Sequence, residues 1–109
     1  MKKIEALITP LKVDEVKDAL AKAGVKGITF SEVKDYGHHP SHVGNYRGSE
    51  YVVDLLPEVK VEIVVEDGDV RQVTDTIICA LRTGRLEDGE ISIFPMETVL
   101  HVRAGVHRA

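Results

Sequence analysis

A single pattern of apolar residues occurs twice along this chain, and it limits the folds that the chain can form. Each copy begins with alternating apolar residues, continues with apolar residues at helical spacing, and returns to a strand-like segment. The predicted order is a strand at 2–9, a helix from Val13 to Gly24, a strand at 27–34, a strand at 59–65, a helix from Val70 to Gly84, and strands at 91–94 and 99–103. The sequence therefore predicts two strand–helix–strand units, followed by a polar tail at 104–109.

Charged residues and a glycine mark the ends of the first predicted helix. Asp14 and Glu15 near its start and Lys22 near its end complement the helix dipole, and Gly24 stops it. Two such units in one chain favour a ferredoxin-like α+β fold, a βαββαβ sandwich in which two helices cover one face of an antiparallel sheet. The length suits one domain with a core, so we expect residues 1–109 to form a single domain.

The face of the sheet away from the helices also needs a cover. Leu7, Ile28 and Val64 are the candidates for that face, and they are too apolar to be left in water. Because an exposed apolar patch promotes association, we expect the chain to form an oligomer through this face.

A long segment at 37–57 separates the two units and has no sustained helical or strand period. Glycines and prolines interrupt it at Gly37, Pro40, Gly44, Gly48 and Pro57. A compact domain rarely carries a loop of that length without a use for it. Two interpretations stay open from spacing alone: a functional loop, or a floppy hairpin tip.

Composition argues against several classes of function. A net charge of -4 leaves no basic face for phosphates, and 5% aromatic residues offer few surfaces for stacking bases, which disfavours nucleic acid. No apolar run is long enough to cross a bilayer, and Met1 leads straight into a predicted strand, so no signal peptide is expected. A single cysteine, Cys79, suits a reducing cytoplasm and is expected to be a packed small residue of the second helix. With no nucleophile–base pair and no carboxylate dyad, an enzyme is not expected.

Three segments carry a resemblance to a known family. YRGSEYVVDLLPEVKVEIVV (46–65) closely resembles the signature loop and following strand of the P-II signal-transduction proteins. MKKIEALITPLKVDEVKDALAKAGVKGITFSEVK (1–34) is similar to that family's first strand, helix and second strand. TDTIICALRTGRLEDGEISIF (74–94) resembles its second helix and nucleotide-facing turn. The likeness covers nearly all of residues 1–103.

The resemblance implies a homotrimer that regulates other proteins and catalyses nothing. Its three inter-subunit clefts would bind adenine nucleotide, often with 2-oxoglutarate, and no cofactor would be tightly bound. The 37–57 loop would contact a membrane transporter or a cytoplasmic enzyme, and Tyr51 stands where many members are uridylylated. The residues of this chain that match the family's partner-binding loop are Tyr46, Arg47, Gly48, Glu50 and Tyr51.

The resemblance also implies a set of nucleotide-binding positions. Thr29 and Glu62 match adenine- and ribose-side groups, and Arg103 matches a phosphate partner, since a guanidinium presents paired donors. The positions assigned to the cleft in this way are Gly27, Thr29, Gly37, His38, Glu62, Val64, Thr83, Asp88, Gly89 and Arg103.

Several cleft positions depart from the family pattern, and the departures make the cleft more acidic. Acids or histidines replace the family's usual glycines, lysines, arginines and glutamine at Asp35, His38, His39, Glu58, Glu87, Glu90 and His101. Each uncompensated carboxylate close to a phosphate costs roughly one to a few kcal/mol at protein-surface dielectric. We therefore expect weak binding of ATP and 2-oxoglutarate, and a preference for ADP, AMP or a different ligand.

The histidines raise the alternative of a metal site. Neutral imidazoles combined with carboxylates ligate zinc, copper, nickel or cobalt. The candidate ligands are His38, His39, His42, Glu58, Glu90 and His101. Solvated loop histidines are the other interpretation, and the spacing does not decide between them.

Four functional hypotheses follow for the chain. The leading one is a P-II-like regulator that senses an adenine nucleotide and controls a partner through its loop. The others are a sensor of a divalent transition metal that regulates metal transport, a sensor of adenylate and bicarbonate, and a structural trimer without a ligand. The sequence does not name the partner.

Overall fold

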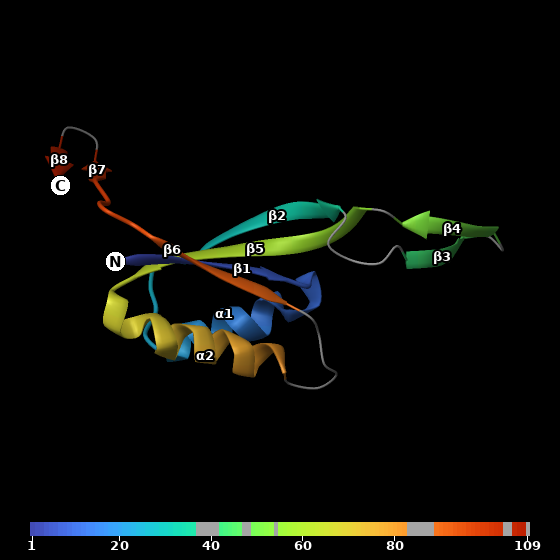
Figure 1. Ribbon diagram of the computed structural model, residues 1–109, viewed down its shortest axis with the longest axis horizontal. Coiled ribbons are helices and arrows are strands. Elements are labelled where there is room, and N and C mark those ends of the chain that lie inside the picture. The colour runs from blue at the N-terminus through green and yellow to red at the C-terminus, as the bar shows by residue number, and fades with distance from the viewer. Residues whose placement is uncertain (37–41, 47–48, 54, 83–88, 104–105, 109) are drawn as a thin grey trace.

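The computed structural model describes residues 1–36, 42–46, 49–53, 55–82, 89–103 and 106–108 (Figure 1). Two helices and eight strands occur among these residues. In chain order they are β1 (Lys2–Ile8), α1 (Val13–Lys22), β2 (Thr29–Tyr36), β3 (His42–Tyr46), β4 (Ser49–Val53), β5 (Leu55–Val65), α2 (Val70–Leu81), β6 (Glu90–Pro95), β7 (His101–Arg103) and β8 (Val106–Arg108).

Four of the strands form one antiparallel sheet in the order β2-β5-β1-β6. The helices α1 and α2 lie side by side on one face of this sheet (Figure 1). In the first half of the chain α1 connects β1 to β2, and β5 lies between these two strands in the sheet. In the second half α2 connects β5 to β6, and β1 lies between them. This arrangement confirms the ferredoxin-like α+β fold predicted from the repeated pattern.

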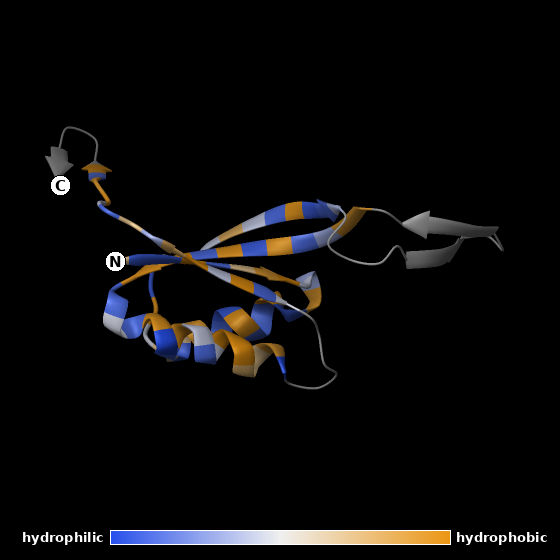
Figure 2. Ribbon diagram, in the orientation of Figure 1, coloured by the Kyte–Doolittle hydropathy of each residue, from blue (hydrophilic) through white to orange (hydrophobic). Residues whose placement is uncertain are grey.

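The core lies between the sheet and the helices. Ile4, Ala6 and Ile8 on β1 are fully buried, and they stand opposite Ile63, Val61 and Val59 of β5 in the sheet register. The helices contribute further buried apolar residues to the same cluster, namely Val16, Leu20, Val73, Ile77, Ala80 and Leu81. Figure 2 shows the resulting bands of hydrophobic and hydrophilic residues along the central strands. The alternation read from the sequence therefore reports burial on one face of the sheet.

Gly24 ends α1 as predicted, and the reason is conformational. Its φ angle is 84°, in the left-handed region that favours glycine. There the N–H of Val25 donates to the carbonyl of Leu20 at 3.0 Å, and the N–H of Gly24 donates to Ala21 at 3.1 Å. These bonds satisfy carbonyls at the end of the helix. Gly27 also has a positive φ of 71°, so β2 begins at Thr29, two residues later than predicted.

The segment at 37–57 contains more regular structure than the sequence predicts. Strands β3 and β4 pair as an antiparallel hairpin, in which Gly44 stands opposite Tyr51. In addition, β5 starts at Leu55, because β2 continues to pair with it as far as Tyr36. Pro57 interrupts the strand pattern in the sequence, yet the sheet accommodates it because β5 pairs only with β2 at that level.

The C-terminal segment differs from the prediction in a similar way. Strand β7 begins at His101 rather than at residue 99, and it pairs with β8, which lies within the predicted tail at 104–109. Figure 1 shows the β7–β8 pair and the β3–β4 hairpin at opposite ends of the molecule. None of the described helices has the length and apolar content that a membrane crossing would need.

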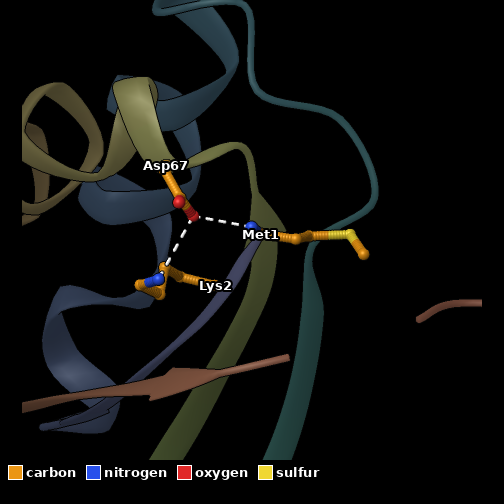
Figure 3. Close-up of polar contacts among 3 residues, drawn as sticks. All are labelled: Met1, Lys2 and Asp67. Carbon is orange, nitrogen blue, oxygen red and sulfur yellow. Dashed lines mark hydrogen bonds and ion pairs between the residues drawn. The ribbon is translucent and has the colours of Figure 1, made fainter. Parts of the chain in front are cut away.

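A polar contact joins the start of β1 to the start of α2 (Figure 3). The Met1 ammonium donates to Asp67 Oδ1 at 2.6 Å, and Lys2 Nζ lies 3.3 Å from the same oxygen. The hydrogen bond from the ammonium, followed by that from Lys2, lowers the pKa of the Asp67 carboxyl below its usual value. Strand β6 is tied to the same corner, because Met96 N–H donates to the carbonyl of Met1 at 3.1 Å.

Candidate functional site

The face of the sheet opposite the helices, here called the open face, carries charged residues where an apolar surface was expected. Lys3 and Glu5 of β1 and Lys60 and Glu62 of β5 occupy its centre. Leu7 and Val64 do lie on this face, but each stands opposite a lysine of the neighbouring strand. Of the other expected apolar residues, Ile28 packs against the helix-side core instead. The expectation was therefore confirmed for Leu7 and Val64 and wrong for Ile28, and the centre of this face is charged rather than apolar.

Ion pairs connect the four charged side chains at the centre of the open face. Glu5 stands directly opposite Glu62 in the register of β1 and β5. Lys3 Nζ lies 3.4 Å from Glu5 Oε2 and 3.5 Å from Glu62 Oε2, and Lys60 Nζ lies 3.6 Å from Glu5 Oε1. Like charges opposite each other in a sheet repel, so these lysines offset the repulsion between the two carboxylates. The Lys3 ammonium also lies 5.0 Å from the centre of the Phe94 ring.

Some of the predicted nucleotide-binding residues gather at one end of the open face, near the start of β1. We call Gly27, Thr29, Glu62 and Val64 the N-end cluster. Thr29 of β2 stands opposite Glu62, and Val64 stands opposite Lys3. Gly27 lies two residues before Thr29, at the turn with positive φ that leads into β2.

A hollow of about 370 Å³ adjoins the N-end cluster, between the end of α1 and the start of α2. Val64 lines it together with Val25 and Lys26, which immediately precede Gly27. This end of the sheet therefore combines a hydroxyl, a carboxylate and an apolar surface.

A second group of predicted site residues lies toward the end of β1. We call Glu58, Gly89 and Glu90 the C-end cluster. Glu90 of β6 stands opposite Leu7, and Glu58 of β5 stands opposite Val33 of β2. Glu62 and Glu58 are four residues apart on β5, which corresponds to about 13 Å along an extended strand. The two clusters therefore occupy different ends of the open face.

Gly89 passes close to the core. A β-carbon at this position would lie 2.9 Å from Leu81 Cδ1 and 3.4 Å from the carbonyl oxygen of Leu7. The first contact is to the end of a flexible side chain, so a small movement of Leu81 would relieve it.

A buried carboxylate and a hollow mark the place where the 37–57 segment joins the sheet. Glu58 is only 8% exposed, as is Lys12, whose ammonium lies 3.2 Å from Glu15 Oε2. The hollow has a volume of about 400 Å³. It is lined by Pro10, Glu32, Val33, Lys34, Pro57, Glu58 and Val59.

The predicted metal ligands are not brought together within the part of the chain that the structure describes. No group of three or more histidine, cysteine, aspartate or glutamate side chains there is placed to hold a metal ion. His101 is on β7, at the opposite end of the molecule from the β3–β4 hairpin that contains His42 (Figure 1). His38 and His39 lie outside the described residues.

Other predicted site residues also fall outside the described part of the chain. These are Gly37, Arg47, Gly48, Thr83, Glu87 and Asp88. The backbone places Tyr46 on β3, Glu50 and Tyr51 on β4, and Arg103 on β7. Asp35 is on β2 opposite Leu56.

Three charged residues of the open face were not predicted from the sequence as site residues, and the burial of one cysteine was predicted wrongly. Lys3, Glu5 and Lys60 were not singled out, although the Lys-x-Glu spacing of 3–5 and 60–62 places each pair on one face of a strand. Cys79 was expected to be packed, but it is exposed on α2. It falls on the outer side of the helix, away from the buried positions Val73 and Ile77.

Comparison with known proteins identifies the class to which this α+β subunit belongs. A family model described as "Nitrogen regulatory protein P-II" matches residues 1–106. The chain is 51% identical to the nitrogen regulatory protein P-II of Azospirillum brasilense and 53% identical to that of Microchaete diplosiphon. It is 49% identical to the nitrogen regulatory protein P-II 1 of Escherichia coli (strain K12). Each alignment spans 105 residues, which are 96% of this chain and 94% of the relative.

The chain therefore belongs to the P-II family of nitrogen regulatory proteins. Members of this family are signalling regulators that act on partner proteins, and they are not enzymes.

Proposed function

We propose that this protein is a homotrimeric P-II regulator that binds an adenine nucleotide between subunits. One observation supports the proposal: cleft residues predicted from the resemblance lie in two clusters at different ends of the open face, and Glu62 of one is about 13 Å along β5 from Glu58 of the other. A compact ligand that lies on the exposed sheet of one chain cannot both span that distance and be buried. A second copy that brings its C-end cluster beside the N-end cluster of the first completes the site.

The chemistry of the clusters suits the two parts of a nucleotide. In the N-end cluster the Glu62 carboxylate accepts hydrogen bonds from ribose hydroxyls, Thr29 offers a hydroxyl to the base, and Val64 contacts its apolar surface. Arg103, on β7 at that same end of the molecule (Figure 1), contributes a guanidinium for phosphate. The C-end cluster of the neighbouring subunit, with His38 and Asp88, surrounds the phosphates.

Charge at the C-end cluster determines which nucleotide binds best. Glu58 and Glu90 lie at this end, and both add negative charge where phosphates would approach. The cost rises with the number of phosphates, so ADP and AMP bind better than ATP. Glu58 stands where the resemblance places a lysine for 2-oxoglutarate, so that dicarboxylate binds weakly.

The β3–β4 hairpin is the partner-binding element of the proposed regulator. Figure 1 shows it beyond the end of the four-stranded sheet, away from the helices. An extended hairpin in that position reaches a membrane transporter or a cytoplasmic enzyme with Tyr46, Arg47, Gly48, Glu50 and Tyr51. Tyr51 is also the residue proposed for uridylylation, and the protein acts in the cytoplasm without a tightly bound cofactor.

A second candidate keeps the trimer but makes the effector a divalent transition metal. The observation in its favour is the buried Glu58 beside the hollow at the base of the 37–57 segment. A carboxylate there attracts a cation, and His38, His39 and His42 come from the adjoining segment. His101 of another subunit and Glu90 complete the ligand set.

Sedimentation equilibrium and calorimetry test both candidates. The proposal predicts a mass of about three chains and tighter binding of ADP than of ATP, with weak 2-oxoglutarate binding. Zinc, copper and nickel are titrated in parallel, and metal binding that disappears in His38→Ala/His39→Ala supports the second candidate. A stable monomer at micromolar concentration overturns the trimer, and tight joint binding of ATP and 2-oxoglutarate overturns the proposed acidic selectivity.

A further inference from the structure

Lys3 occupies the centre of the open face and contacts side chains of three strands there. Its ammonium lies 3.5 Å from Glu62, 3.4 Å from Glu5 and 5.0 Å from the centre of the Phe94 ring. Residues of three adjacent strands, β1, β5 and β6, therefore meet at one cation. Val64, a member of the N-end cluster, stands directly opposite Lys3 in the register.

Without Lys3 the Glu62 carboxylate would face a like charge that is compensated only in part. Glu5 stands directly opposite Glu62, and β-carbons of such cross-strand neighbours are about 5 Å apart. The side chains of Glu5 and Glu62 are 20% and 31% exposed, so solvent screens their repulsion incompletely. Lys60 offsets part of the charge of Glu5, but its ion pair among the described residues is with Glu5 and not with Glu62.

We infer that Lys3 is a positioning residue of the nucleotide site, which holds the Glu62 carboxylate in place for the ribose hydroxyls. The inference rests on the proposed function, since it assigns Glu62 to the nucleotide. Lys3 itself acts through Glu62: it neutralises the repulsion from Glu5 that would otherwise displace the Glu62 carboxylate. A cation–π contact with Phe94 holds the Lys3 ammonium in turn, because a cation over an aromatic ring is attracted to the ring face.

The experiment compares two lysines of the same face by calorimetry with ADP. Lys3→Met removes the charge and keeps the length of the side chain, and it should weaken ADP binding about tenfold, because the Glu62 carboxylate loses its ion pair and is repelled by Glu5. Lys60→Met is the matched control and should stay within about twofold, because Lys60 pairs with Glu5 alone. Lys3→Arg keeps the charge and should also stay within about twofold.

A second substitution separates positioning from direct contact or from simple loss of structure. Glu5→Gln removes the repelling charge, so the double variant Lys3→Met/Glu5→Gln should recover most of the ADP affinity that Lys3→Met loses. Thermal unfolding without nucleotide should show the same rescue, with a midpoint lowered by about 1–5 °C in Lys3→Met and restored in the double variant.

The outcomes distinguish this inference from the proposed function. ADP binding that is equally tight in the unaltered protein and in Lys3→Met overturns the positioning role and leaves the nucleotide site intact. Binding that stays weak in Lys3→Met/Glu5→Gln also overturns it, because Lys3 would then contact the ligand or support the fold. Absence of adenine nucleotide binding by the unaltered protein overturns the proposed function and the role of Lys3 together.

Discussion

The two faces of the central sheet are built from the same strands, yet they carry different types of side chain. On the helix side Ile4, Ala6 and Ile8 are fully buried within one chain. On the open face the alternate residues Lys3 and Glu5 are partly exposed and form ion pairs. The helix side buries its apolar residues within a single chain, whereas the open face presents charged side chains that stay partly exposed.

The energetics of the two faces support this division. Burial of apolar surface is non-directional and contributes roughly 25 cal/mol per Å², so the helix side supplies most of the stability of the fold. Ion pairs that keep contact with water typically contribute only about 0–1 kcal/mol each. The charged residues of the open face are therefore poorly explained by stability of the monomer. Recognition explains them better, because charge arrangement gives specificity more than affinity.

The largest expected effect comes from deleting a side chain on the helix side. Ile63 is 1% exposed, and Ile63→Ala should lower the free energy of unfolding by about 2–5 kcal/mol, through lost burial and the cavity left behind. Val64 is its neighbour on the open face and is 40% exposed, so Val64→Ala should cost less than about 1 kcal/mol. Urea denaturation of both variants measures the difference. Equal losses would show that both faces stabilise the fold alike.

A smaller effect is expected from reversing a charge of the C-end cluster. Glu90 is exposed on β6, so Glu90→Lys should leave the fold intact and tighten ATP binding about fivefold, with less effect on AMP. Asp18→Lys makes the same change of net charge on the exposed surface of α1 and is the control. Calorimetry with both nucleotides gives the result. If the two variants tighten ATP equally, the effect comes from net charge and not from the site.

The smallest expected effect concerns the ion pairs of Asp67, whose exposed side chain lies just beyond the end of β5. The folded-state pKa of Asp67 is lowered from its ordinary value of 3.8, so its contribution to stability is present above that pH and is lost as the pH falls through the folded pKa. Asp67→Asn should therefore lower the thermal midpoint slightly at pH 6, and by less at pH 3. A difference between variant and parent that grows toward acid would contradict this sign.

The sequence predicts the helix side of the sheet well, because burial leaves an alternation that one strand records by itself. Ile4, Ala6 and Ile8 are the clearest case, and Gly24 is predicted for a comparable local reason. A hairpin at 37–57 was only one of two open interpretations, and the pairing of β3 with β4 was not predicted because neither segment shows a strand period alone.

The open face was harder to predict because its chemistry depends on register. The sequence shows Lys3 and Glu62, but only the pairing of β1 with β5 places one beside the other. The same limitation applies to the site, since the resemblance supplied Thr29 and Glu62 but not the cation that holds the carboxylate. Only the fold shows that His101 and the β3–β4 hairpin lie at opposite ends of the molecule.

The most direct test of the account is whether one ligand site needs two chains. One variant, Thr29→Val/Glu62→Gln, disables the N-end cluster, and the other, His38→Ala/Asp88→Ala, disables the side that includes the C-end cluster. The two are produced together with different affinity tags, and trimers that contain both are isolated by sequential purification. ADP binding is then measured beside trimers of each variant alone. The account predicts weak binding in both pure trimers and one restored site in every mixed trimer, whereas mixed trimers that bind no better than the pure ones would place the site within a single chain.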